Sequence, residues 1–155
     1  MHLRVTKEPQ EITPLGDFMA DSMKDTGILV LGHGSRLQYN KELIESMASM
    51  IRDVHPGPVR TAYLNMNEPD IKAGLQSFSG TKIKKIVALP VFLASGVHVS
   101  KDIPRELGMN GTKKAVLSQD GEKIDILLAE PLGADECIAN LTYRRFIACC
   151  EHVQG

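Results

Sequence analysis

This chain of 155 residues contains no tryptophan, only 5% aromatic residues and no long apolar run. A membrane-spanning helix needs about 20 consecutive apolar residues, so no membrane partner is expected. Residues 1–25 lack the apolar core and small-residue cleavage site of a secretory signal, because Pro9, Pro14 and several charges interrupt them. We therefore expect a cytoplasmic protein.

Neither sign of charge dominates, since 18 lysines and arginines face 19 aspartates and glutamates. A nucleic-acid-binding surface is strongly basic, so no nucleic-acid partner is expected. Cysteine is also scarce: Cys137, Cys149 and Cys150 lie near the C-terminus and form no C-x-x-C pair. We interpret them as small buried residues in a reducing compartment.

The pattern that is present is an alternation of apolar runs and helical repeats. It predicts an α/β fold with an open, mainly parallel four-stranded sheet and helices on both faces, as in a flavodoxin-like protein. Residues 1–26 are interpreted as an irregular N-terminal extension, with residues 27–155 forming one domain. The strands are expected at residues 28–31, 59–64, 83–93 and 124–129, the helices at 39–55, 71–78, about 100–107 and 134–152, and a polar loop at 110–123.

The extension contains four large apolar residues, Ile12, Leu15, Phe18 and Met19, which are expected to pack back on the domain. The helix at 39–55 places its apolar residues at helical spacing. These residues, which should share one buried face, are Leu43, Ile44, Met47, Met50, Ile51 and Val54.

Two histidines follow predicted strands directly. His33 lies in the run GHGSR after the first strand, and His98 ends the run Gly96-Val97-His98 after the third. Right-handed crossovers place the first and third strands side by side, and ligands bind at the carboxyl edge of such sheets. Two imidazoles at this edge suit a divalent metal ion or proton transfer near neutral pH.

Other readings of the glycine-rich run are weaker. GHGSRL has Leu37 where a dinucleotide-binding motif has its third glycine, and no acidic residue ends the second strand. Ser35 does not lie in a G-x-S-x-G elbow. The glycines instead permit a sharp turn and the close approach of a flat ligand. A phosphate- or nucleotide-binding protein, and a non-catalytic metal or tetrapyrrole carrier, stay open as alternatives.

Charged residues accompany the histidines at the same edge. Glu68 follows the second strand and either caps the helix that Pro69 begins or accepts an N–H group of a ligand. Four cations lie just beyond the histidine loops and serve either as solvated surface charges or as partners of ligand carboxylates. These cations are Arg36, Lys41, Lys101 and Arg105.

The segments LGHGSRLQYNKEL, NEPDI, LPVFLASGVHVSKDIPREL and EPLGAD resemble the small, single-lobed archaeal sirohydrochlorin chelatases. The resemblance covers about residues 27–152 and is strongest to methanogen members. It implies insertion of Co²⁺ or Ni²⁺ into sirohydrochlorin, in cobalamin synthesis or in synthesis of a nickel tetrapyrrole for methanogenesis, without an organic cofactor. The methanogen-like motifs favour nickel.

The resemblance also implies residue roles. His33 would be a metal ligand and the proton acceptor, and His98 the second metal ligand. Many relatives carry glutamate where this chain has Asn65, and residues 110–123 lack the histidines that some relatives have there. The residues implied to contact the tetrapyrrole are Glu68, Leu93, Ala94, Ser95, Gly96, Val97 and His98.

One lobe provides only one wall of a cleft, whereas longer relatives have two facing lobes. A homodimer would supply the second wall, and two-fold dimers are the commonest assemblies. The last helix is a candidate contact because it carries more apolar surface than one sheet face requires. It carries Tyr143, Phe146, Ile147 and Cys150 on one side and Ile138 and Leu141 on another.

Overall fold

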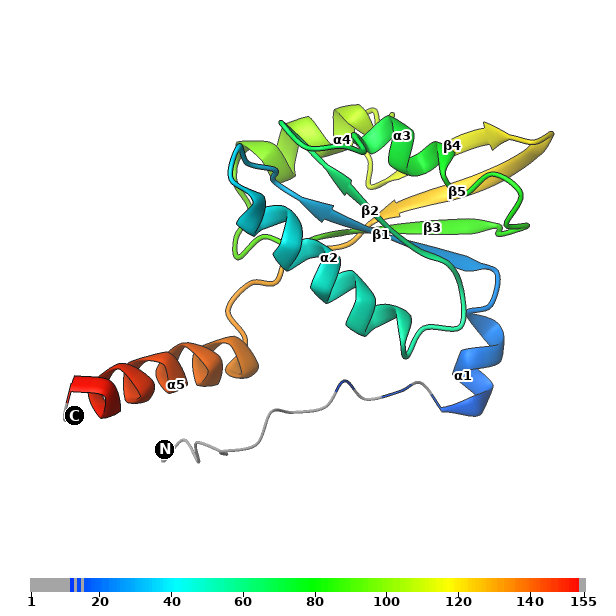
Figure 1. Cartoon of the computed structure of the whole chain (residues 1–155). Helices are drawn as coiled ribbons and strands as arrows, with labels where there is room; N and C mark the ends of the chain where they lie inside the picture. Colours follow the sequence, from blue (N-terminus) through cyan, green and yellow to red (C-terminus); the bar gives the residue numbers. More distant parts are fainter. Residues whose placement is uncertain (1–11, 13, 15, 154–155) are drawn as a thin grey trace.

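The computed structural model describes residue 12, residue 14 and residues 16–153. Strands and helices alternate along most of this part of the chain (Figure 1). In chain order the elements are α1 (Asp17–Ser22), β1 (Thr26–Gly32), α2 (Gln38–Arg52), β2 (Val59–Tyr63), α3 (Ile71–Gln76), β3 (Lys85–Pro90), the π-helix η1 (His98–Asp102), α4 (Ile103–Glu106), β4 (Lys114–Gln119), β5 (Glu122–Leu128) and α5 (Glu136–Val153).

The strands form one five-stranded sheet in the order β2-β1-β3-β5-β4. β1 pairs in parallel with both β2 and β3, and β3 pairs in parallel with β5. The predicted α/β class is therefore confirmed, and so is the adjacency of the first and third strands. This adjacency brings the chain segments after β1 and β3 to the same edge.

The sheet has one strand more than expected, because part of the predicted polar loop at 110–123 forms β4. This strand pairs antiparallel with β5 across a turn at Asp120 and Gly121, which have φ angles of 54° and 79°. Only alternate residues of β4 are half-buried, among them Ala115 and Leu117 against the core. An edge strand that is buried on one face has a weak apolar pattern, so the polar residues and turn signals concealed it.

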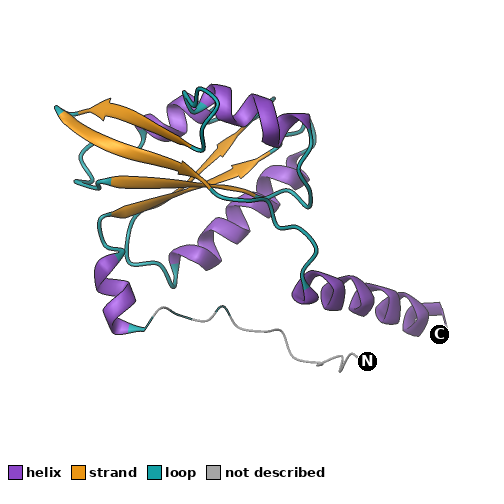
Figure 2. Cartoon of the chain, turned by 180° about the vertical axis from the view of Figure 1, so that it is seen from behind, coloured by secondary structure: helices purple, strands orange, loops and turns teal. Residues whose placement is uncertain are grey.

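The two faces of the sheet are covered unequally. α3 and α4 lie on one side of the sheet and α2 on the other (Figures 1 and 2). The larger core, under α3, η1 and α4, includes Leu29, Phe78, Ile86, Ile103 and Ile126. The smaller core, under α2, consists of Val30, Ile44, Ala48, Val59 and Tyr63.

α2 does not bury all of its expected apolar face. Ile44 and Ala48 are buried, whereas Leu43 and Met50 are 54% and 50% exposed. α2 packs on β1 and β2. Leu43 and Met50 lie to the side of this contact with the sheet and are therefore exposed to solvent.

On the side of the sheet where α2 lies, no other helix of the described residues covers β3, β5 and β4 (Figures 1 and 2). The strand register places Val87 and Leu89 of β3 beside Ile28 and Val30 of β1, on the face that α2 covers. Val87 pairs with Leu127 of β5, so the same face continues outward. We call this surface the open half-face and define it by Val87, Leu89, Val116 and Leu127; Val116 is 59% exposed.

The predicted extension is not wholly irregular, since it contains α1 and the first residue of β1. The expected packing of its apolar residues is wrong for those that the structure describes. Ile12, Phe18 and Met19 are 44%, 90% and 50% exposed. Leu15 lies outside the described residues.

α5 projects away from the sheet on an extended connection (Figures 1 and 2). Cys137, Cys149 and Cys150 all lie on this helix and are exposed, so their expected burial is wrong. The reason is that nothing in the described chain packs over α5. No helix among the described residues has the length and apolar character needed to span a membrane.

Candidate functional site

His33 is the first residue after β1, and the turn that follows it requires glycine. Gly34 has a φ of +84°, a conformation that side-chain-bearing residues rarely adopt. A Cβ atom at this position would lie 1.7 Å from the carbonyl oxygen of Asn65. The Gly34 amide donates to Asn40 Oδ1 at 3.0 Å, which ties the turn to α2.

The loop after β2 supports this turn from the other side. The Asn65 amide donates to the His33 carbonyl oxygen at 3.0 Å. Asn67 Oδ1 accepts a 2.7 Å hydrogen bond from the Ser35 amide. Asn65 and Asn67 therefore hold the backbone on both sides of the His33 turn.

His98 is the first residue of η1. Val99 faces the core at 6% exposure, and the Ser100 amide donates to the Gly96 carbonyl oxygen at 2.9 Å. His98 Nδ1 lies 2.8 Å from Asp102 Oδ2. Local π-helical geometry is common at functional sites.

The structure brings the two histidines together. The His33 and His98 ring centroids are 4.7 Å apart with an interplanar angle of 80°. Phe92 lies edge-on to His33 at 6.1 Å. Both histidines are exposed, so the pair lies at the surface where a ligand can reach it.

The hydrogen bonds assign the same tautomer to both rings. His33 Nδ1 lies 3.0 Å from the Gly34 carbonyl oxygen, and His98 Nδ1 faces the Asp102 carboxylate. Both partners are acceptors, so each Nδ1 is the donor, and in the neutral imidazole each Nε2 then carries the lone pair. Neither Nε2 has a hydrogen-bond partner within the described part of the chain. Neutral imidazole in this state is a ligand for transition metals.

The histidine pair does not by itself enclose a metal ion. Within residues 16–153, no group of three or more histidine, cysteine or acidic side chains is arranged to hold one. A divalent ion bound by two imidazoles keeps open positions for other ligands. Such an arrangement suits an ion in transit better than a structural metal.

Glu68 is exposed near this edge but has no hydrogen bond or ion pair to either histidine in the described structure. Its Oε2 accepts from the Asp70 amide at 3.2 Å, and its carbonyl oxygen accepts from Lys41 Nζ at 3.1 Å. Of the two roles left open for Glu68, capping of α3 belongs instead to Asp70, whose side chain accepts from the Ala73 amide at 2.7 Å.

The segment from Leu93 to Val97 forms an exposed surface beside His98. Leu93 and Val97 are 65% and 64% exposed, so this loop presents apolar side chains to solvent. β3 ends at Pro90, earlier than the predicted strand, so these residues belong to a loop. A Cβ atom added to Gly96 would meet nothing within 4 Å. The space above Gly96 is therefore open to a ligand.

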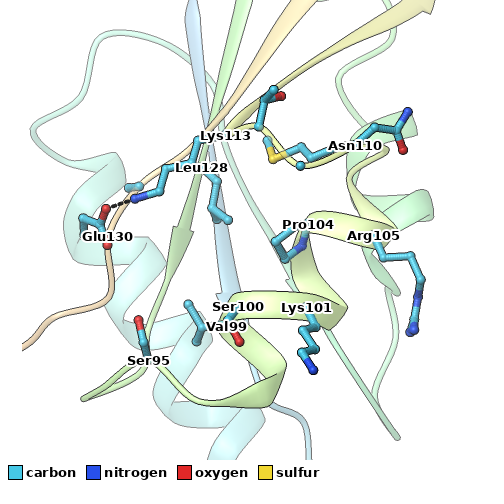
Figure 3. Close-up of a pocket in the computed structure, with 14 residues that line it drawn as sticks. Ser95, Val99, Ser100, Lys101, Pro104, Arg105, Asn110, Lys113, Leu128 and Glu130 are labelled. Atoms are coloured by element: carbon cyan, nitrogen blue, oxygen red, sulfur yellow. Dashed lines mark hydrogen bonds and ion pairs between the residues drawn. The ribbon is translucent and has the colours of Figure 1, made fainter.

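A cavity of about 610 Å³ lies next to this loop (Figure 3). Ser95, Lys101 and Arg105 line it, together with Lys113 and Glu130, which form an ion pair across from the helix. Lys101 has no hydrogen-bond or ion-pair partner in the described structure, whereas Arg105 contacts Asp102 and Glu106 at 3.4 and 3.5 Å.

The other two cations of the expected group, Arg36 and Lys41, do not line this cavity. The four predicted cations therefore do not form one group. Lys101 and Arg105 both line the cavity, whereas Lys41 donates a hydrogen bond to the Glu68 carbonyl oxygen.

Sequence reasoning missed three supporting residues. Asn40 and Asn67 accept from backbone amides of the His33 turn, and Asp102 contacts His98. Asp102 follows His98 by four residues in a segment expected to be helical, which is the spacing of side chains that meet on one helix face. Nothing in the sequence marks the two asparagines: Asn40 lies only six residues from Gly34 but in no recognisable motif with it, and Asn67 meets an amide 32 residues away.

The fold and the site together define a class: an α/β lobe that presents two histidines beyond adjacent parallel strands, with imidazole nitrogens available to a metal. The CbiX family model matches residues 27–149. The chain belongs to the CbiX family.

Named relatives agree with this assignment. The sirohydrochlorin cobaltochelatase of Methanosarcina barkeri is 46% identical over 120 residues, covering 77% of this chain and 92% of the relative. That of Methanosarcina acetivorans is 44% identical over 120 residues, with the same coverage.

Solved structures share the fold. A putative cobalamin biosynthesis CbiX protein from Marinobacter aquaeolei VT8 has a TM-score of 0.57 and 24% identity, over 84% of this chain and 99% of that one. SirB from Bacillus subtilis with Fe³⁺ has a TM-score of 0.65 and 23% identity, over 77% of this chain and 45% of that one. This chain therefore corresponds to about half of the SirB chain.

Proposed function

We propose that this protein is a chelatase that inserts a divalent metal ion, Co²⁺ or Ni²⁺, into sirohydrochlorin. The observation that carries the proposal is the His33–His98 pair, with ring centroids 4.7 Å apart and both Nε2 atoms unpartnered in the described structure. The relatives named sirohydrochlorin cobaltochelatase support this substrate.

The reaction balances without an organic cofactor. The metal ion and the tetrapyrrole are both substrates, and two inner N–H protons leave as the ion enters. We assign His33 as metal ligand and proton acceptor and His98 as second metal ligand. Neutral imidazole binds cobalt and nickel and accepts protons, so one residue type meets both requirements.

The tetrapyrrole would lie over the exposed loop before His98. Leu93 and Val97 offer apolar surface to a macrocycle, and Gly96 leaves room above the backbone. We assign Glu68, Leu93, Ala94, Ser95, Gly96, Val97 and His98 as its contacts. Lys101 and Arg105, beside the adjoining cavity, suit carboxylate groups at the edge of the macrocycle.

An anaerobic absorbance assay with sirohydrochlorin tests the proposal. Catalysed spectral change on addition of Co²⁺ or Ni²⁺, at a rate proportional to enzyme and through many turnovers, is the expected result. A stoichiometric change that stops after one equivalent would identify a carrier instead. Both metals should be inserted, because two imidazole ligands impose little coordination geometry. Their rates should differ, because the affinity of nitrogen ligands rises from Co²⁺ to Ni²⁺.

We further propose that the active unit is a homodimer in which α5 contacts the second copy. α5 exposes Tyr143 and Phe146 at 51% and 57%, and their rings stack with centroids 5.6 Å apart. Parallel sheets are normally covered on both faces, yet nothing in the described part of the chain covers the open half-face. A helix with an exposed apolar side and a sheet that lacks a helix are complementary.

The connection to α5 favours a second copy as the occupant. The amides of Leu132 and Gly133 donate to the carbonyl oxygens of Phe92 and Leu93, both at 2.9 Å. These bonds hold the connection at the carboxyl edge of the sheet, from which α5 projects outward (Figure 1). The open half-face also contains a hollow of about 370 Å³, lined by Val116 and Leu127 together with the charged residues Lys85, Lys114 and Asp125.

We assign residues 27–155 to the chelatase lobe and residues 1–26 to an extension of it, and we place the protein in the cytoplasm. The family match, which begins at residue 27, supports the boundary between the extension and the lobe.

A further inference from the structure

Asp102 has two partners and belongs to none of the groups assigned above. It ends η1, and its side chain is 24% exposed. Oδ2 lies 2.8 Å from His98 Nδ1, and Oδ1 lies 3.4 Å from Arg105 Nη2. One oxygen thus contacts a site histidine and the other a guanidinium group.

The local backbone produces this contact. η1 covers His98 to Asp102 and passes directly into α4 at Ile103, which is fully buried. Val99 is also buried, so the helix is anchored to the core at two points beside these residues. The relative positions of the His98 and Asp102 side chains are therefore set by a packed helix, which restricts their motion.

We infer that Asp102 is a positioning residue that holds His98 as the Nδ1–H tautomer and keeps its Nε2 available to the substrate metal. This inference rests on the proposed metal-binding role of His98. Histidine ligands commonly donate their second N–H group to a carboxylate or carbonyl oxygen, which orients the ring and makes it a better ligand. Arg105 holds the carboxylate from its other oxygen.

The two histidines are supported differently. His33 donates to a backbone carbonyl oxygen, that of Gly34, which no side-chain substitution removes. His98 donates to a side chain. The orientation of His98 can consequently be changed by one substitution that leaves both imidazoles in place.

The test measures Co²⁺ binding to the full chain by visible absorption, without tetrapyrrole. Asp102→Ala should weaken Co²⁺ binding by about 10- to 100-fold, the usual effect of losing such a partner. Asp102→Asn should restore part of this loss, because an amide oxygen also accepts from Nδ1–H. In the insertion assay Asp102→Ala should raise the metal KM and leave the sirohydrochlorin KM unchanged.

Glu106→Ala is the matched control. Glu106 is a neighbouring carboxylate that also contacts Arg105, at 3.5 Å, but has no contact with His98 in the described structure. This variant should bind Co²⁺ like the unmodified protein. An equal loss of Co²⁺ affinity in Glu106→Ala and Asp102→Ala would overturn the inference, because the loss of any nearby negative charge would then explain the effect.

Unchanged Co²⁺ affinity in Asp102→Ala would also overturn the inference while leaving the proposed chelatase function intact. Failure of the unmodified protein to bind Co²⁺ or to insert it would instead contradict the proposed function. If Asp102→Ala does not fold, Asp102→Asn and Asp102→Glu provide the comparison, and indistinguishable Co²⁺ affinities and absorption spectra in both would contradict a positioning role.

Discussion

The imidazole of His33 meets that of His98 nearly at a right angle, with ring centroids 4.7 Å apart, although the residues follow different strands. The contact exists because β1 and β3 are parallel neighbours, with Leu31 paired to Pro90 near their ends. Each ring uses Nδ1 for a hydrogen bond with the protein, which leaves two Nε2 atoms at one edge of the sheet.

Removal of either imidazole should affect insertion far more than stability. His33→Ala should abolish insertion, and His98→Ala should weaken it strongly, because each removes a proposed metal ligand. Both residues are exposed, so the free energy of unfolding should change by only about 0.5 kcal/mol. Absorbance assays and urea denaturation on the same samples measure the two effects.

His55→Gln is the matched control for these variants. His55 Nε2 contacts the Thr26 carbonyl oxygen at 2.8 Å, at the opposite end of β1. Its substitution should leave insertion unchanged. Full activity in His33→Ala or His98→Ala would remove the basis of the proposed site.

Gly34→Ala should destabilise the protein and reduce insertion together. The added Cβ would lie 1.7 Å from the Asn65 carbonyl oxygen, so the loop carrying His33 must move. Gly80→Ala separates the two causes, because Gly80 also has a positive φ, +77°, but nothing within 4 Å of an added Cβ. Strain at φ alone costs about 1–3 kcal/mol. Urea denaturation should show a larger decrease in the free energy of unfolding for Gly34→Ala than for Gly80→Ala, and only Gly34→Ala should lose activity.

Gly96→Leu tests whether a flat ligand lies over the loop before His98. An added Cβ at Gly96 meets no protein atom within 4 Å, so thermal stability should be retained. A bulky side chain would instead collide with a tetrapyrrole, and the sirohydrochlorin KM should rise by about tenfold, equivalent to about 1.4 kcal/mol. Co²⁺ binding in the absence of tetrapyrrole should not change. An unaltered sirohydrochlorin KM would move the ligand away from this loop.

Tyr63 should make the protein less stable in alkali. Burial and the carboxylate of Glu45, which accepts from the Tyr63 hydroxyl at 2.9 Å, raise the pKa of Tyr63. Above about pH 10 the unfolded chain releases this proton and the folded chain retains it, so the free energy of unfolding falls as pH rises. The contribution of one such group is about 1.4 kcal/mol per pH unit.

Tyr63→Phe removes this proton and measures the effect. At pH 7 the variant should be less stable by about 0.5–1.5 kcal/mol, because it loses a hydrogen bond. The difference should shrink as pH rises above 10. A difference that stays constant from pH 8 to 11 would show that Tyr63 titrates alike in both states.

Phe146→Glu should weaken association and insertion together if α5 covers the open half-face of a second copy. Phe18→Glu is the control, since Phe18 is 90% exposed on α1 and has no part in the proposed contact. Sedimentation and the insertion assay on the same samples compare the two variants. A stable, fully active monomer would show that one lobe suffices and that α5 does not pair copies.

The sequence alone was sufficient to predict much of the sheet and the two histidines. Buried parallel strands form continuous apolar runs, and the residues after such strands lie at a ligand-binding edge. The sequence pattern therefore suffices to pair His33 with His98. β4 was missed because an edge strand buried on one face has a weak apolar pattern, and Asp120-Gly121 resembled a loop rather than a hairpin turn.

Tertiary structure alone decided which side chains support the histidines and which surfaces stay open. Asn67 meets the Ser35 amide only because the loops after β1 and β2 lie side by side. α5 has a sequence that suits burial, yet its cysteines are exposed because the described chain places nothing over it. Local residue patterns set which segments are helix or strand, since periodicity depends on near neighbours. Contacts between side chains from distant segments depend on how those elements pack, and the periodicity of the sequence does not determine that packing.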